Sequence, residues 1–377
     1  MASGLKFREV FTARTTTAVL YFQEAGNQTS TADQISLQLY EPPNRASNFT
    51  PQVGNDGSVE FVGPTKINTE NYFYLPTGDT ESRGGNRGLM GGGVFSDNRN
   101  IIEYVTIQST GNATDFGDLT VDRRGLASCS SSTRGVWGGG TGGSPDTFKA
   151  TLDYVTISST GNAQSFGNLT ELLRQKAALS NSTRGIFAGG YNPTHNSIIE
   201  YITISSTGSA KIFGDLSANK SAMFACSSQT RGLFAGGAPP ATISLIEYIT
   251  ISSTGDTTNF GDLTVGRGYG GGCSNPTRGV FGAGTSPQTN VVDYVTISST
   301  GDAQDFGDLS LTKSDLNAFA GSDRGIFFGG YSSPNPVAFN TIDYITISST
   351  GNYKDFGDLT VNRTQLAGCS NGHGGLG

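Results

Sequence analysis

The sequence predicts an all-β fold, a six-bladed β-propeller preceded by a small N-terminal β domain. The first supporting observation is that the segment Ile101–Thr120, IIEYVTIQSTGNATDFGDLT, returns five more times along the chain. The second is its spacing, because the marker tyrosines recur every 46 to 50 residues, the length of a propeller blade. The third is that both ends of the repeat region are incomplete copies. The marker tyrosines are Tyr104, Tyr154, Tyr201, Tyr248, Tyr294 and Tyr344.

Residues 1–82 contain no copy of the repeat. Short runs rich in β-branched and aromatic residues, separated by Gly, Asn, Pro and Asp, are typical of strands. These runs are KFREVFT, AVLYFQ, ISLQLYE, SVEFV and NYFYL. We therefore expect a separate β domain over residues 1–82 and a propeller over residues 83–377.

Each repeat divides into four strands, illustrated by GLASCSS, GVWGGG, DYVTISS and AQSFGNL. The third strands carry apolar or bulky residues on both faces, which suits sheets that are covered on both sides. The first copy begins at its second strand, Asn86–Gly93, and the chain finishes with an unmatched first strand, Arg363–Asn371. Pairing of these two segments would complete the sixth blade and remove the open sheet edges.

Composition argues against several classes of function. The formal net charge of −7 argues against nucleic acid as the main partner, because phosphate binding needs a basic surface. No apolar run approaches the roughly 20 residues of a membrane-spanning helix, so membrane insertion is not expected. The N-terminus has no apolar segment of the kind found in signal peptides.

The four cysteines share one repeat position, which holds leucine or phenylalanine in the other two copies. A position that accepts Cys, Leu or Phe is an apolar strand position, where free cysteine behaves as a small hydrophobic residue. We therefore expect four buried, unpaired thiols rather than disulfides. They are Cys129, Cys226, Cys273 and Cys369.

No motif indicates catalysis, a metal or a cofactor. Asp115-Phe116-Gly117 matches a protein-kinase tripeptide, but it occurs in three copies without the glycine-rich loop of kinases. Only two histidines are present, His195 and His373, so no histidine-based catalytic or metal cluster is visible. We expect a protein that is not an enzyme. A carbohydrate-active enzyme of propeller fold is a further alternative, and it would need a carboxylate cluster outside the repeat.

Five bases occupy one repeat position before the first strand, and each follows an aspartate by five residues. One hypothesis is a basic ring at a mouth of the central channel that selects anionic ligands. The other is a repeated acid–base pair that braces the loop between strands four and one. The remaining copy has Asn168 and Leu173 instead, and this joint loss favours the brace. The five bases are Arg123, Lys220, Arg267, Lys313 and Arg363.

Two other charged series are unbroken: an arginine before every second strand, and an acid before every marker tyrosine. We expect both to be structural, because a ligand site rarely needs six identical copies.

The loops between the second and third strands differ in length and chemistry from copy to copy, and such loops often contain the residues that recognise a ligand. The alternative is that they are solvent-exposed linkers without a ligand. Candidate ligand-binding residues in them are Phe148, Lys149, Tyr191, His195, Tyr331 and Phe339.

The repeat resembles that of kelch-type propellers over Arg83–Gly377. It has the basic residue before strand one, the double glycine ending strand two, and the tyrosine of strand three followed by an aromatic residue in strand four. That aromatic residue is phenylalanine here, as in Phe116, where kelch repeats usually have tryptophan. The pattern YVTISSTGN, DFGDLT and TRGVFGGG is also similar to repeats in structural proteins of marine bacteriophages.

These resemblances imply a non-enzymatic virion structural protein of a bacteriophage, such as a tail fibre or decoration protein, made in the host cytoplasm. Residues 1–82 would bind other virion proteins, and the propeller would face outward to bind host-surface polysaccharide or to decorate the particle. The protein would be oligomeric in the particle. The alternative is a kelch-like protein–protein interaction module of a bacterium.

Overall fold

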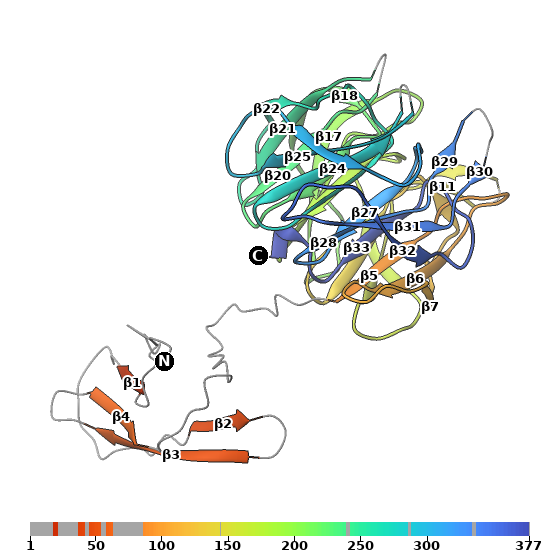
Figure 1. Cartoon of the computed structure of the whole chain (residues 1–377). Helices are drawn as coiled ribbons and strands as arrows, with labels where there is room; N and C mark the ends of the chain where they lie inside the picture. Colours follow the sequence, from red (N-terminus) through yellow and green to blue (C-terminus); the bar gives the residue numbers. More distant parts are fainter. Residues whose placement is uncertain are drawn as a thin grey trace. The chain divides into compact units, whose positions relative to one another are not determined.

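The computed structural model describes residues 86–376, except residues 144, 239–241, 286–287 and 334–336, and four strands among residues 1–85. The chain separates into two compact units, Met1–Asp79 and Thr80–Gly377, close to the expected boundary. In the first unit four strands form one antiparallel sheet in the order β1-β4-β3-β2 (Figure 1). They are β1 (Ala18–Tyr21), β2 (Leu37–Glu41), β3 (Arg45–Val53) and β4 (Ser58–Val62).

Strand β3 was not expected from the sequence, and it contains Pro51. It lies in the middle of the sheet, between β4 and β2. Two other expected strands, residues 6–12 and residues 71–75, lie outside the described residues.

The second unit contains six four-stranded antiparallel sheets (Figure 1). The first sheet consists of β33 (Ala367–Ser370), β5 (Arg87–Gly91), β6 (Ile101–Thr106) and β7 (Thr114–Asp118). The second consists of β9 (Ala127–Ser130), β10 (Arg134–Gly138), β13 (Thr151–Thr156) and β14 (Gln164–Asn168). The third consists of β15 (Ala177–Ser180), β16 (Arg184–Ala188), β17 (Asn196–Thr203) and β18 (Lys211–Lys220).

The fourth sheet consists of β19 (Phe224–Ser227), β20 (Arg231–Ala235), β21 (Leu245–Thr250) and β22 (Thr258–Asp262). The fifth consists of β23 (Gly271–Ser274), β24 (Arg278–Gly284), β25 (Thr289–Thr296) and β26 (Gln304–Asp308). The sixth consists of β27 (Asn317–Ala320), β28 (Arg324–Phe328), β31 (Thr341–Thr346) and β32 (Lys354–Asp358). Outside these sheets lie β8 (Arg123–Arg124), β11 (Thr141–Gly142), β12 (Thr147–Phe148), β29 (Tyr331–Ser332), β30 (Val337–Ala338) and the 3-10 helix η1 (Gly374–Leu376).

The first strands of the six sheets contact one another in a closed cycle, β33, β9, β15, β19, β23, β27 and back to β33. The C-terminal strand β33 pairs with β5, so Cys369 lies opposite Leu89, as the unmatched ends of the repeat predicted. The hydrophobic core lies between neighbouring sheets. One cluster, for example, joins Val136 of the second sheet to Phe187 of the third.

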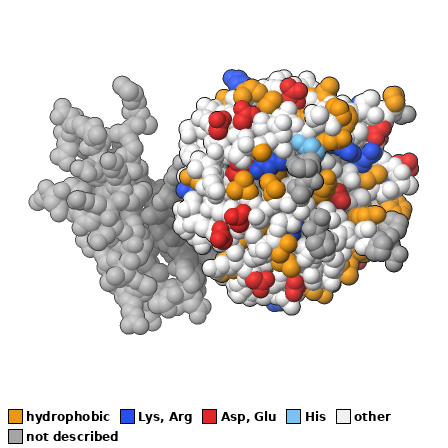
Figure 2. Space-filling model, turned by 90° about the horizontal axis from the view of Figure 1, so that it is seen from above, with side chains coloured by type: hydrophobic (Ala, Val, Ile, Leu, Met, Phe, Trp, Pro, Cys, Tyr) orange, Lys and Arg blue, Asp and Glu red, His pale blue; other side chains and the backbone are white. Residues whose placement is uncertain are grey.

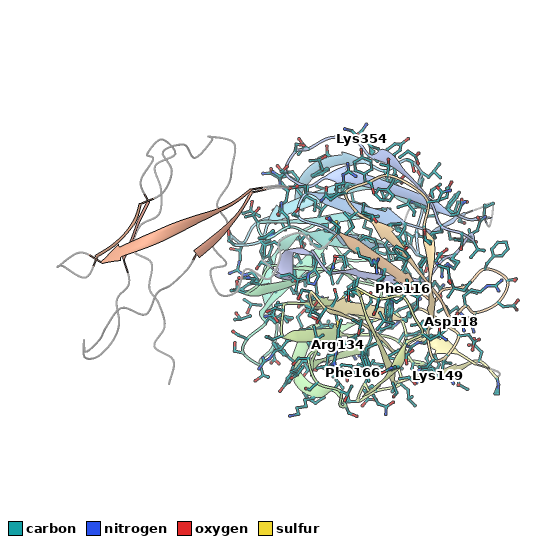
Figure 3. All side chains as sticks on the ribbon, turned by 90° about the horizontal axis from the view of Figure 1, so that it is seen from below. Phe116, Asp118, Arg134, Lys149, Phe166 and Lys354 are labelled. Atoms are coloured by element: carbon teal, nitrogen blue, oxygen red, sulfur yellow. The ribbon has the colours of Figure 1, made fainter. Side chains whose placement is uncertain are left out.

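The unbroken arginine series links each sheet to the next. The Arg134 guanidinium lies 4.8 Å from the ring centre of Tyr154, which packs edge-on against Phe166. Arg134 and Phe166 are labelled in Figure 3. Arg134 Nη1 donates a hydrogen bond to the carbonyl of Ile204 in the next repeat, at 3.1 Å. The corresponding arginine of every sheet makes the same two contacts, and Arg324 closes the cycle by donating to Ile107 of the first sheet. The structural role expected for this series is therefore confirmed. Its members are Arg87, Arg134, Arg184, Arg231, Arg278 and Arg324.

The four cysteines are buried and unpaired, as expected. Burial raises the pKa of the Cys369 thiol to about 12, so almost none of it is in the reactive thiolate form at neutral pH.

At the ends of the first strands, five serine hydroxyls each donate a hydrogen bond to a backbone carbonyl of the neighbouring first strand. The sixth position holds Ala320, so this ring of hydrogen bonds is open there. The five serines are Ser130, Ser180, Ser227, Ser274 and Ser370.

Candidate functional site at the mouth of the central cavity

The five bases that precede the first strands are buried, and none pairs with the aspartate five residues upstream. Arg267 donates to the carboxylate of Asp293 on β25, at 2.8 Å, whereas Asp262 is exposed and accepts from Ser244. The other four bases pair in the same way with the acid before the marker tyrosine of the sheet whose first strand they precede. The predicted partners were therefore wrong. The pairs are Arg123–Asp153, Lys220–Glu247, Arg267–Asp293, Lys313–Asp343 and Arg363–Glu103.

The third sheet keeps this ion pair by another route. Lys176, three residues beyond the expected position, places its Nζ 2.8 Å from the carboxylate of Glu200. The same Nζ donates to the carbonyl of Gly189, as Arg123 donates to that of Gly139. The pair is thus moved rather than lost in this copy, which corrects the reading of Asn168 and Leu173 as a joint loss.

These ion pairs have no access to a ligand. The side chains of all six pairs are at most 2% exposed. Burial lowers the pKa of the Arg123 guanidinium, against the raising effect of the Asp153 carboxylate beside it. The acid also accepts from a Thr or Ser on the incoming connection, such as Thr120 on Asp153 at 2.5 Å. The hypothesis of a basic ring open to anionic ligands is therefore wrong. The ion pairs instead attach each connection between a fourth strand and the following first strand to the sheet that follows it.

A ring of six residues lies just before the first strands, at the opposite end from the serines, and we call this end the mouth. All six residues have positive φ, between 54° and 61°. Each N–H donates to the carbonyl of its counterpart in the preceding sheet, at 2.6 to 2.9 Å, and the cycle is closed. Five of the six are not glycine, although positive φ costs such residues roughly 1–2 kcal/mol each. The mouth ring is Gly125, Gln175, Ala222, Tyr269, Asp315 and Gln365.

Tyr269 and Asp315 of the mouth ring interact electrostatically with each other and with Arg174. Asp315 accepts a hydrogen bond from Ser314 Oγ, and the side chains of Gln365 and Arg174 also act on its carboxyl group. Burial raises the pKa of Asp315 to about 6, against the lowering effect of these neighbours. Burial likewise raises the pKa of Tyr269, and the nearby Asp315 adds to this effect.

Three of the six candidate loop residues gather around Arg174. Its guanidinium lies 5.4 Å from the ring centre of Tyr191 and 6.0 Å from that of Phe148. The rings of Tyr191 and His195 are 4.9 Å apart, and His195 Nδ1 lies 3.1 Å from Ser221 Oγ. Figure 2 shows a face on which histidine atoms border basic and hydrophobic side chains.

The other three candidates are not brought into this group. The Lys149 amino group is hydrogen-bonded to Thr147 of its own loop, at 2.8 Å. Tyr331, on β29, pairs through its backbone with Ser314, the neighbour of Asp315. For Phe339, the N–H donates to the carbonyl of Gly330. The structure therefore divides the candidates into a cluster at Arg174 and residues elsewhere on the loops.

The cavity enclosed by the first strands is too small to hold an organic ligand. Its two parts, of about 60 and 50 Å³, share lining residues such as Ser128 and Ala178. That is room for a few water molecules, whereas ligand pockets are usually several hundred Å³. Binding at this end must therefore occur on the mouth rather than inside the cavity.

The C-terminal tail covers the serine end of the cavity. His373 Nε2 lies 3.0 Å from the carbonyl oxygen of Ser130, and its Nδ1 accepts a hydrogen bond from the N–H of Gly375. Both ring nitrogens are thus satisfied when the proton is on Nε2 and the imidazole is neutral. Burial lowers the pKa of His373 to about 4.

We expect the free energy of unfolding to fall as the pH falls from 6.5 to 4, because unfolded chains take up a proton at His373 there and folded chains do not. The shift from 6.5 to about 4 corresponds to about 3 kcal/mol. Urea unfolding at pH 7 and pH 4 would measure this loss, with His373→Gln as the control that lacks the titrating group. Equal pH dependence in the two proteins would show that the tail histidine is not held neutral.

Comparison with known proteins assigns no family. The chain matches no model of a protein family, and a search of curated proteins finds no significant match. Among the described residues, no helix is long and apolar enough to cross a membrane. The same part of the chain holds no group of three or more His, Cys, Asp or Glu side chains placed to bind a metal ion.

Proposed function

We propose that the second unit is a closed six-bladed β-propeller of kelch-like construction, and that it acts as a binding scaffold rather than an enzyme. The closed cycle of first strands, the pairing of β33 with β5 and the cyclic arginine links support this architecture. Each four-stranded sheet would be one blade, with its first strand at the axis.

The proposed binding role rests on one observation: the buried contacts are the same in every sheet, whereas the side chains around the mouth differ from sheet to sheet. Every sheet repeats the same buried ion pair and the same arginine link. The loops around the mouth instead differ, and they bring Arg174, Phe148, Tyr191 and His195 together. Varied side chains on a rigid framework are typical of recognition surfaces.

We further propose that the chain is a bacteriophage virion structural protein, as the resemblance of its repeats to those of marine phages implies. The N-terminal β unit would attach it to other virion proteins, and the propeller would present the mouth to host-surface polysaccharide. A kelch-like interaction module of a bacterium is the second candidate.

Mass spectrometry of purified particles tests the virion role. Particles of a phage that carries this sequence should contain the chain, and a deletion of residues 1–82 should remove it from them. If the shortened chain were incorporated at full occupancy, the attachment role of the first unit would be wrong. If the full chain were found in cells and never in particles, the bacterial module would be favoured.

A further inference from the structure

Asp315 differs from the buried acids of the third strands. Each acid of a third strand forms an ion pair with the base that precedes the first strand of its sheet. Asp315 is half-buried, yet it makes no ion pair with any described residue. Its carboxyl group accepts a hydrogen bond from Ser314 Oγ, at 3.3 Å, and the Gln365 side chain also favours its charged form. A carboxyl group that is buried without a cation is costly unless something else compensates it.

Arg174 acts electrostatically on this carboxyl group without forming an ion pair with it. The two residues belong to the third and sixth sheets, which are opposite each other in the cycle of first strands. They interact electrostatically, but no nitrogen of Arg174 comes within ion-pair distance of an acid in the described residues. Arg124, at the equivalent position of the second sheet, does have an acidic partner, Asp146 at 2.7 Å.

Two polar atoms of this group are buried and have no hydrogen-bond partner in the part of the chain that the structure describes. They are Arg174 Nε, a donor, and Gln365 Oε1, an acceptor. An unsatisfied buried donor or acceptor costs about 1–3 kcal/mol. Both side chains are only partly buried, so they can turn outward to a ligand. A ligand that then offers an acceptor to one atom and a donor to the other would recover that cost.

We propose that Arg174, Tyr191, Tyr269, Asp315 and Gln365, the mouth cluster, bind a neutral sugar residue through two adjacent hydroxyl groups. One hydroxyl donates to Asp315 or to Gln365 Oε1. The other accepts from the Arg174 guanidinium. This inference rests on the proposed binding function and specifies its ligand class.

A neutral ligand fits better than an acidic sugar. A carboxylate placed on Arg174 would also approach the Asp315 carboxyl, and like charges at short range oppose each other. The side chains of Tyr191 and Tyr269 are partly exposed, so they offer apolar surface to the C–H face of a sugar ring. Because the cavity behind the mouth is too small for a sugar, the contact is shallow and millimolar affinity is expected.

Saturation-transfer NMR on the full chain at pH 7.5 tests this inference. The probes are the methyl glycosides of glucose, galactose, mannose, rhamnose and N-acetylglucosamine, with glucuronate as the acidic comparison. At least one neutral glycoside should receive saturation, and glucuronate should not. Saturation of glucuronate alone, or of no neutral glycoside, would overturn the proposal.

Two variants locate the binding. Asp315→Gly removes the carboxyl group while tolerating the positive φ, and Arg174→Met removes the guanidinium while keeping much of its volume. Each should weaken binding at least tenfold. Lys149→Met, on a neighbouring loop outside the mouth cluster, should bind as the original protein does. Fluorescence of the buried Trp137 checks that each variant is folded.

If both variants bound the glycoside unchanged, the site would lie elsewhere and the proposal would be wrong. That outcome is separate from the test of the virion role, because incorporation into particles does not depend on the mouth cluster.

Discussion

Deletion of residues 361–377 should lower the free energy of unfolding of the second unit by more than about 5 kcal/mol, which is enough to unfold many domains. The deletion removes β33 and leaves the edge of β5 unpaired. It also removes Arg363 and so leaves Glu103 buried without its base. The loss of one partner of a buried ion pair alone costs about 3–5 kcal/mol.

The chain carries its own reporter for this experiment. Trp137 is its single tryptophan, and the indole Nε1 donates to the carbonyl of Ala367 on β33, at 3.1 Å. Deletion should therefore shift tryptophan emission to the red as well as lower the melting temperature. A synthetic peptide of residues 361–377, added in excess, should reverse both changes. Near-original melting of the truncated chain would show that the C-terminal strand does not close the unit.

The repeat allowed the all-β class, the closure and the free cysteines to be predicted. The strand pattern recurs six times, so local ambiguity in one copy is resolved by the others. The unmatched ends, Asn86–Gly93 and Arg363–Asn371, identified the pair of strands that closes the cycle. A position that alternates between Cys129 and residues such as Leu179 or Phe319 indicated apolar burial, and all three side chains are buried.

The partners of the bases could not be predicted from distance along the chain. Asp262 is close to Arg267 in sequence, but it lies at the exposed end of an outer strand. Arg267 instead turns inward between strands, where Asp293 of the third strand meets it. The sequence did contain a clue to the true partners, because an acid precedes the marker tyrosine in all six copies. A charged residue that is retained in every copy and buried there needs a partner in every copy.

The mouth cluster was missed for a different reason. The mouth ring is defined by backbone conformation, and its six positions hold five different residue types. No side-chain pattern marks it, and only Gly125 and Asp315 are of types that are enriched at positive φ. In the sequence, Arg174 is simply the residue after Leu173, which stands where the other five copies have a base. Its approach to Asp315 depends on the cyclic closure of sheets far apart in sequence.

Asp293→Asn should lower the free energy of unfolding by about 3–5 kcal/mol, because it leaves the Arg267 guanidinium buried without a counter-charge. Arg267 is inaccessible and donates to Asp293 Oδ2, which is also held by Thr264. Urea unfolding followed by Trp137 fluorescence would measure the loss. The double variant Arg267→Met with Asp293→Asn should lose less than Asp293→Asn alone, since removal of both charges avoids an unpaired buried cation.

The matched control is Asp262→Asn, which neutralises the acid five residues before Arg267. Asp262 is exposed, and an asparagine there can still accept the hydrogen bond from Ser244. Its loss should be below about 1 kcal/mol, as for other surface charges. The two single variants therefore separate the two possible partners of the base. If Asp262→Asn were the more destabilising of the two, Arg267 would have its functional partner upstream, and the buried pair with Asp293 would not carry the stability that we assign to it.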